Sequence, residues 1–160
     1  MELREVSVSL PFGLGSLTLT VSDAERRAAW ALYVELMTRV AIQPFDPEHG
    51  SLRAALSSLH RVFVLTREIL RESGPEVARG PRSFGPLALR VCAEGLAPFL
   101  TRWHAALGEH EALRDEARSE GAHERAWELR GELLAELIEL QAEMRSFARA
   151  LAKISGAELE

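Results

Sequence analysis

The stretch VSVSLPFGLGSLTLTVSDAE, residues 6–25, is where a two-residue period gives way to a helical one. Apolar residues alternate first with serine and then with threonine, on either side of PFGLG, residues 11–15. Such alternation is typical of strands with one apolar face, and the glycines supply the positive backbone angles of a tight turn. The sequence therefore predicts a β-hairpin over residues 1–21. Its apolar face would hold Val6, Val8, Leu10, Leu17, Leu19 and Val21.

A helix start follows the hairpin directly. SDAE, residues 22–25, is a capping box, in which Ser22 and Glu25 each bond the other's backbone amide. Beyond it the apolar spacing changes to three and four residues, which predicts helices over about 22–42, 51–72, 86–107 and 122–154. We expect the first of these helices to bury Trp30, Tyr33, Val34, Met37, Val40 and Ala41.

These elements indicate a mainly α protein. Four amphipathic helices with short connections favour an antiparallel four-helix bundle over residues 22–155, preceded by the hairpin. The length of 160 residues favours one domain, residues 1–160. Pro98 lies inside the third helix and should kink it. The fourth helix is the longest, and its regular apolar spacing begins just after Gly131.

That extra length predicts a further feature. We expect residues 133–154 to pack in the bundle and residues 122–130 to bend away from it. The bent segment carries Trp127, which we predict as a contact between two copies in a homodimer.

Composition argues against several classes of function. The net charge of −5 disfavours nucleic acid as the default partner, because phosphate binding depends on concentrated basic charge. Cys92 is the single cysteine, so no intrachain disulfide can form. We find no signal peptide and no apolar run long enough to span a bilayer. We therefore expect a cytoplasmic protein with no default membrane partner.

No motif supports a metal site or a cofactor. A diiron bundle needs two Glu-x-x-His motifs, and Glu120–His123 is the single such spacing. No phosphate-binding glycine loop or nucleophile elbow is present. We expect no metal, no cofactor and no catalytic residue.

Two stretches leave an enzymatic alternative open. HEPN ribonucleases are helical bundles whose Arg-x4–6-His motifs meet across a dimer, and both Arg53–His60 and Arg118–His123 have that spacing. In an arginine-rich chain one or two such matches arise by chance, and neither arginine is followed by Asn or Asp. A ribonuclease dimer is the first alternative. A bundle that opens onto membranes, with Gly95 and Pro98 as hinges, is the second.

Three segments carry a resemblance. WALYVELMTRVAIQPFDPEHGSLRAALSSLHRVFVLTREIL, residues 30–70, together with PFLTRWH, residues 98–104, and HERAW, residues 123–127, resembles a group of small helical bacterial proteins without an assigned activity. The resemblance implies a component of a multi-component conflict system. It carries over no functional residue.

A two-stranded sheet keeps two unpaired edges, and nothing in SVS or TLT blocks the addition of another strand. We therefore predict a non-enzymatic interaction protein, a subunit or adaptor of a larger bacterial assembly. Its hairpin would recruit a protein partner by β-augmentation. The predicted partner-binding residues are Val6, Val8, Leu17, Leu19 and Trp127.

Overall fold

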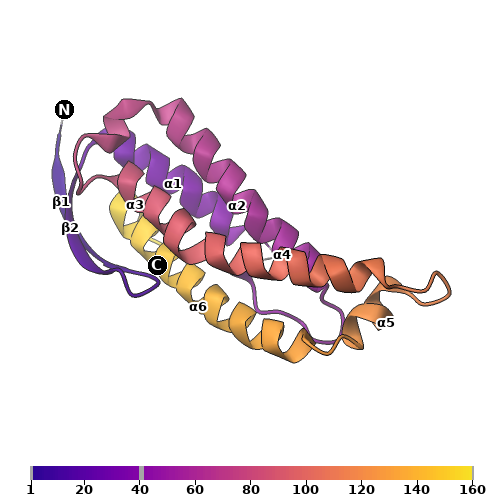
Figure 1. The fold of residues 1–160 in the computed structure, drawn as a ribbon. Helices are drawn as coiled ribbons and strands as arrows, with labels where there is room; N and C mark the ends of the chain where they lie inside the picture. Colours follow the sequence, from indigo (N-terminus) through magenta and orange to yellow (C-terminus); the bar gives the residue numbers. More distant parts are fainter. Residues whose placement is uncertain (1, 40–41, 160) are drawn as a thin grey trace.

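The computed structural model describes residues 2–39 and 42–159, and it is mainly helical with an N-terminal two-stranded sheet (Figure 1). Strand β1 (Arg4–Leu10) pairs antiparallel with β2 (Gly15–Val21), with Val6 opposite Leu19. The predicted hairpin is confirmed. Its turn contains Phe12, whose φ of 59° lies in the left-handed region that non-glycine residues rarely adopt.

The apolar face of the hairpin lies on the helices. Its apolar side chains are buried or half-buried in the same core as those of the helices, and β1 lies against α6 (Arg130–Ser155). At the turn, the Phe12 amide donates to the Glu143 carboxylate of α6 at 2.7 Å. The hairpin is thus fixed to the helices by both apolar packing and a charge-assisted hydrogen bond.

Helix α1 (Asp23–Met37) begins with the predicted capping box. The Glu25 amide donates to Ser22 Oγ at 3.3 Å, and the Ser22 amide donates to the Glu25 carboxylate at 2.7 Å. The helix ends at Met37 rather than near Ile42, and Thr38 is its C-cap. The predicted core positions Val40 and Ala41 lie outside the described residues.

The predicted buried face of α1 was wrong for three of its described residues, while Tyr33 is half-buried against the core. Trp30, Val34 and Met37 are about two-fifths exposed, while the core side of the helix holds Ala28, Ala29, Leu32 and Leu36. Small side chains allow close approach of neighbouring elements, and α1 packs between α2 and α6 through this alanine-containing face. Both faces have helical spacing, so periodicity alone did not distinguish them.

Helix α2 (Leu52–Ser73) matches its prediction closely. Ser51 caps its start, and Gly74, with φ of 76°, ends it. A short 3₁₀ helix, η2 (Pro75–Ala78), and an irregular segment then lead to α3 (Phe84–Arg90).

The predicted third helix is irregular just before Pro98. The helix begins at Phe84 rather than Pro86, and a π-helical segment, η3 (Val91–Leu96), separates α3 from α4 (Ala97–Ala112). Proline cannot supply the amide that the preceding turn needs, and a wider turn accommodates this missing donor. The π segment lies immediately before the turn that contains Pro98.

The predicted fourth helix is divided. A short helix, α5 (Glu120–Arg125), is followed by a turn, and α6 begins at Arg130. The single helix predicted over residues 122–154 is therefore two helices, and the break lies a few residues before Gly131, where a bend was predicted. The regular apolar face, residues 133–154, lies on α6 as expected.

Figure 1 shows α1, α2, α4 and α6 running side by side, with the hairpin at the end where α1 begins and α6 finishes, and α5 at the opposite end. Within the described ranges, no helix combines the length and the apolar character needed to cross a bilayer.

Candidate functional site

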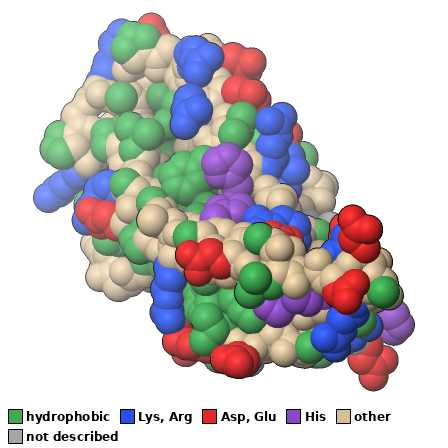
Figure 2. All heavy atoms as spheres, turned by 45° about the vertical axis from the view of Figure 1, so that its right-hand side comes forward, with side chains coloured by type: hydrophobic (Ala, Val, Ile, Leu, Met, Phe, Trp, Pro, Cys, Tyr) green, Lys and Arg blue, Asp and Glu red, His purple; other side chains and the backbone are tan. Residues whose placement is uncertain are grey.

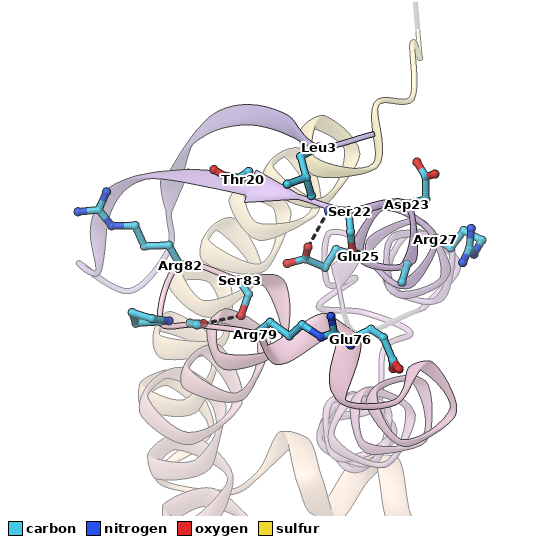
Figure 3. A pocket seen from close by; sticks show the side chains of 13 residues that line it. Leu3, Thr20, Ser22, Asp23, Glu25, Arg27, Glu76, Arg79, Arg82 and Ser83 are labelled. Atoms are coloured by element: carbon cyan, nitrogen blue, oxygen red, sulfur yellow. Dashed lines mark hydrogen bonds between the residues drawn. The ribbon is translucent and has the colours of Figure 1, made fainter. Parts of the chain in front are cut away.

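A hollow lies between the hairpin, the start of α1 and the segment before α3 (Figure 3). It has a volume of about 720 Å³. Leu3 and Thr20 line it from the hairpin, Ser22 and Arg27 from the start of α1, and residues 79–83 from the opposite wall. We refer to it as the hairpin cavity.

One buried carboxylate organises this cavity. Glu25 is 4% exposed, and its Oε2 atom accepts from the Ser22 amide at 2.7 Å. Its Oε1 atom accepts from the Phe84 amide at 2.9 Å. A single side chain therefore satisfies amides at the starts of both α1 and α3, where helices leave donors without partners. This fixes the two walls of the cavity relative to each other.

The cavity has an excess of available positive charge. Within the described part of the chain, the guanidinium groups of Arg27, Arg79 and Arg82 make no ion pair or hydrogen bond. Of the lining acids, Asp23 pairs with Arg26 at 3.5 Å, and Glu25 is held by backbone amides. Glu76 is the remaining lining acid. The lining thus includes three arginines without partners and one such carboxylate, which favours an anionic ligand.

An unpaired strand edge borders the same cavity. The sheet contains β1 and β2 alone, so one edge of β2 has no neighbouring strand among the described residues. Figure 3 shows that edge opposite the 79–83 segment, with Glu25 between them. An extended chain in the cavity would therefore meet both unpaired backbone groups of β2 and the arginines of the opposite wall.

The predicted partner-binding residues of the hairpin lie mainly in the core. Val8 and Leu19 are buried, and Val6 and Leu17 are half-buried against the helices. Their side chains position the sheet, while the exposed backbone edge is what strand addition would use. Recruitment of a partner by the hairpin stays a prediction.

Trp127 lies at the other end of the molecule. Its half-buried ring stacks on His110, with centroids 5.4 Å apart, and meets the edge of the Trp103 ring at 6.0 Å. The residue thus packs against α4 of its own chain, in the turn between α5 and α6. A contact between two copies at this position stays a prediction.

The structure brings the first ribonuclease candidate pair to one place. Arg53 Nη1 lies 2.8 Å from His104 Nδ1, and the ring centroids of His60 and His104 are 5.9 Å apart. Arg53 also forms an ion pair with Glu111 at 2.6 Å. Burial lowers the pKa of His104, and the neighbouring Arg53 and His60 lower it further, against a smaller opposite effect of Glu111.

The second candidate pair is arranged differently. His123 Nε2 lies 2.6 Å from the His110 carbonyl, and His110 Nε2 lies 2.7 Å from the His123 carbonyl. The two rings stack with centroids 3.8 Å apart, which joins α4 to α5. Arg118 is exposed, and its carbonyl accepts from Arg114. These contacts give His123 a structural role.

Sequence reasoning did not identify the arginines of the hairpin cavity. Arg79 and Arg82 lie in GPEVARGPRS, residues 74–83, a loop whose proline and arginine content was the available signal. Their position opposite β2 depends on Glu25 bonding an amide 59 residues away. Across the described ranges, no three His, Cys, Asp or Glu side chains are placed to hold a metal ion.

Comparison with known proteins gives no family assignment. No protein-family model matches the chain, and neither the search of curated proteins nor the search of solved structures found a match.

Proposed function

We propose that this protein is a non-enzymatic interaction module, a subunit or adaptor of a larger bacterial assembly. In this proposal α1, α2, the α3–α4 unit and α6 act as an antiparallel four-helix bundle that supports the hairpin. The partner contributes an extended segment that adds to the outer edge of β2.

The observation that carries the proposal is the position of this edge. It borders a cavity of about 720 Å³ whose other wall is already fixed by the bond between Glu25 and the Phe84 amide. A site that is formed before binding loses less conformational entropy when its ligand arrives. Backbone pairing would supply affinity, and the cavity wall would supply selection among segments.

The arginines that line the hairpin cavity indicate the charge of the partner segment. Arg79 and Arg82 line the cavity opposite β2, and Arg27 lines it from α1. Charge complementarity across an interface increases the association rate and disfavours partners of the wrong sign. The expected partner segment is therefore extended, acidic and rich in β-branched residues, which favour strand conformation.

Two synthetic peptides test this directly. Fluorescein-labelled EVTVEVE and its basic counterpart KVTVKVK have the same β-branched residues and opposite charge. The proposal predicts saturable anisotropy changes with the acidic peptide and much weaker binding of the basic one. Replacing both Arg79 and Arg82 with Glu should reverse this preference.

The matched control changes two exposed arginines on another surface. Arg61 and Arg118 line none of the hollows described here, and their replacement with Glu makes the same change in net charge. This variant should retain most of its preference for the acidic peptide. Equal binding of both peptides by the wild type, or an equal effect of the two double variants, would contradict the proposal.

The ribonuclease remains a second candidate because Arg53 and His60 both adjoin His104. Arg53, the arginine of this motif, contacts His104 Nδ1 and is paired with Glu111, so its guanidinium is engaged within the chain. An engaged guanidinium is less available to a substrate phosphate. This observation favours the interaction module over the nuclease.

A further inference from the structure

A second hollow, separate from the hairpin cavity, runs between α2 and α4. It has a volume of about 340 Å³. Its two sides repeat the same spacing of three, four and seven residues: His60, Phe63, Val64 and Arg67 on α2, and Ala97, Leu100, Thr101 and His104 on α4. We call it the histidine groove. Figure 2 shows the corresponding face, where histidine side chains lie beside a hydrophobic area.

The polar groups of this groove include no acid. Its walls are mostly apolar, and the polar side chains are His60, Arg67, Thr101 and His104. A cationic ligand would find no carboxylate among these lining residues. The lining instead favours a ligand with an apolar body, an anionic group and hydrogen-bond acceptors.

At one end of the groove, the contact with Arg53 fixes which nitrogen of the His104 ring can donate a hydrogen bond. Arginine has no acceptor, so the contact between Arg53 Nη1 and His104 Nδ1 requires Nδ1 to accept. Neutral His104 then carries its proton on Nε2. The ring is held as a hydrogen-bond donor, suited to a neutral acceptor such as a carbonyl oxygen. His60 stands edge-on to it at 5.9 Å.

At the other end lies a permanent positive charge. Arg67 is exposed, and within the described ranges its guanidinium makes no ion pair or hydrogen bond. It lies seven residues beyond His60 on α2, which is about 10 Å along the helix. Phe63, Val64 and Leu100 line the groove between the two ends.

We propose that the histidine groove binds a nucleotide unit, with the phosphate on Arg67, the base against Phe63 and Leu100, and a base carbonyl on His104 Nε2–H. Guanidinium groups pair well with phosphate oxygens, and bases stack on aromatic side chains regardless of sequence. The same unit occurs as a free nucleoside monophosphate and within a single strand. The proposal does not depend on the hairpin cavity.

Nuclear magnetic resonance titration of the full ¹⁵N-labelled chain tests it. The probes are uridine monophosphate, adenosine monophosphate, uridine, inorganic phosphate and octauridylate. A nucleotide or the octamer should cause saturable shifts in the amides of α2 and α4 around the groove, with uridine and phosphate alone binding at least about tenfold more weakly. Equal binding of nucleotide and octamer assigns the groove to free nucleotides, and binding of the octamer alone assigns it to strands.

Matched variants separate the groove from general charge. Arg67→Gln should weaken binding by about tenfold, and Arg67→Lys should restore part of it, because a charge-assisted contact is lost and then partly replaced. Arg61→Gln removes an exposed charge from the same helix, outside the groove, and should leave the affinity within about twofold. The proposal is overturned if neither nucleotide nor octamer causes saturable shifts at millimolar concentration, or if Arg67→Gln and Arg61→Gln have the same effect.

Discussion

The ring of Phe12 occupies the space where a side chain on Gly95 would begin. A Cβ atom built on Gly95 would overlap the Phe12 ring, so the hairpin turn and the π segment η3 fit together because position 95 is glycine. Phe12 adopts a positive φ at this contact, and its amide is held by Glu143 of α6. Local backbone strain of this kind persists where surrounding contacts fix it.

Gly95→Ala should therefore displace Phe12. We expect the free energy of unfolding to fall by about 1–3 kcal/mol, as in other overpacked sites. Gly108→Ala is the control, since a Cβ there meets no atom within 4 Å. In a helix interior this second change should be neutral or stabilising by up to about 1 kcal/mol. Urea denaturation measures both, and equal effects would show that Phe12 does not pack against Gly95 as described.

Glu25 should matter more for stability than its place at a helix start suggests. Glu25→Ala leaves the buried amides of Ser22 and Phe84 without their carboxylate partner, which should cost about 3 kcal/mol. Glu76→Ala removes an exposed acid from the rim of the same cavity and should change stability by less than about 0.5 kcal/mol. Chemical denaturation with a circular dichroism readout compares the two. Similar losses in both variants would contradict the double role of Glu25.

Local sequence patterns predicted the hairpin and most of the helices well, but they did not predict which elements pack against each other. Alternation predicted the hairpin, and SDAE predicted the start of α1, because both depend on residues close in sequence. The second bond of Glu25, to the Phe84 amide, joins positions 59 residues apart and has no local signal. The exposure of Trp30 likewise follows from which neighbours α1 meets, and periodicity does not specify them.

The same difference applies to the residues of the two candidate sites. Their local sequence signals were visible, but their contacts with distant residues were not. The arginine-rich loop was visible in the sequence, but the role of Arg82 opposite β2 required the fold. The spacing of Arg53 and His60 was also visible. Their common neighbour, His104, lies on another helix and was found from the structure.

The lowered pKa of His104 predicts a dependence of stability on pH. A histidine whose pKa is lower in the folded state than in the unfolded state binds protons more readily when unfolded. Its contribution is therefore fully present above the ordinary value of 6.5 and is lost as pH falls below it. The difference in unfolding free energy between wild type and His104→Gln should therefore become smaller as the pH is lowered from 7.5 to 5.

The control for this experiment is His49→Gln. His49 is exposed in the loop before α2, where its ring lies 2.9 Å from the Asp46 carboxylate. This substitution removes a histidine that adjoins neither Arg53 nor His60. Urea titrations at several pH values test both variants, and a pH-independent difference for His104→Gln would contradict the prediction.

We expect no histidine-dependent cleavage of RNA. Arg53 of the first candidate pair is engaged by His104 and Glu111, and His123 of the second is engaged with the His110 carbonyl. Purified wild type, His60→Ala and His123→Ala should therefore leave a fluorescent RNA substrate equally intact. Cleavage by the wild type that either variant abolishes, with unchanged thermal unfolding, would replace the interaction module with the ribonuclease.

The most direct test of the central claim is amide hydrogen exchange of β2, residues 15–21, with and without saturating EVTVEVE. Strand addition at the outer edge predicts slower exchange at alternate β2 amides, those that point away from β1, because every second residue directs its backbone groups to that side. KVTVKVK at the same concentration should leave their exchange unchanged. Bound acidic peptide with no added protection in β2, or with protection confined to the helices, would contradict the claim that this protein recruits its partner through the edge of its hairpin.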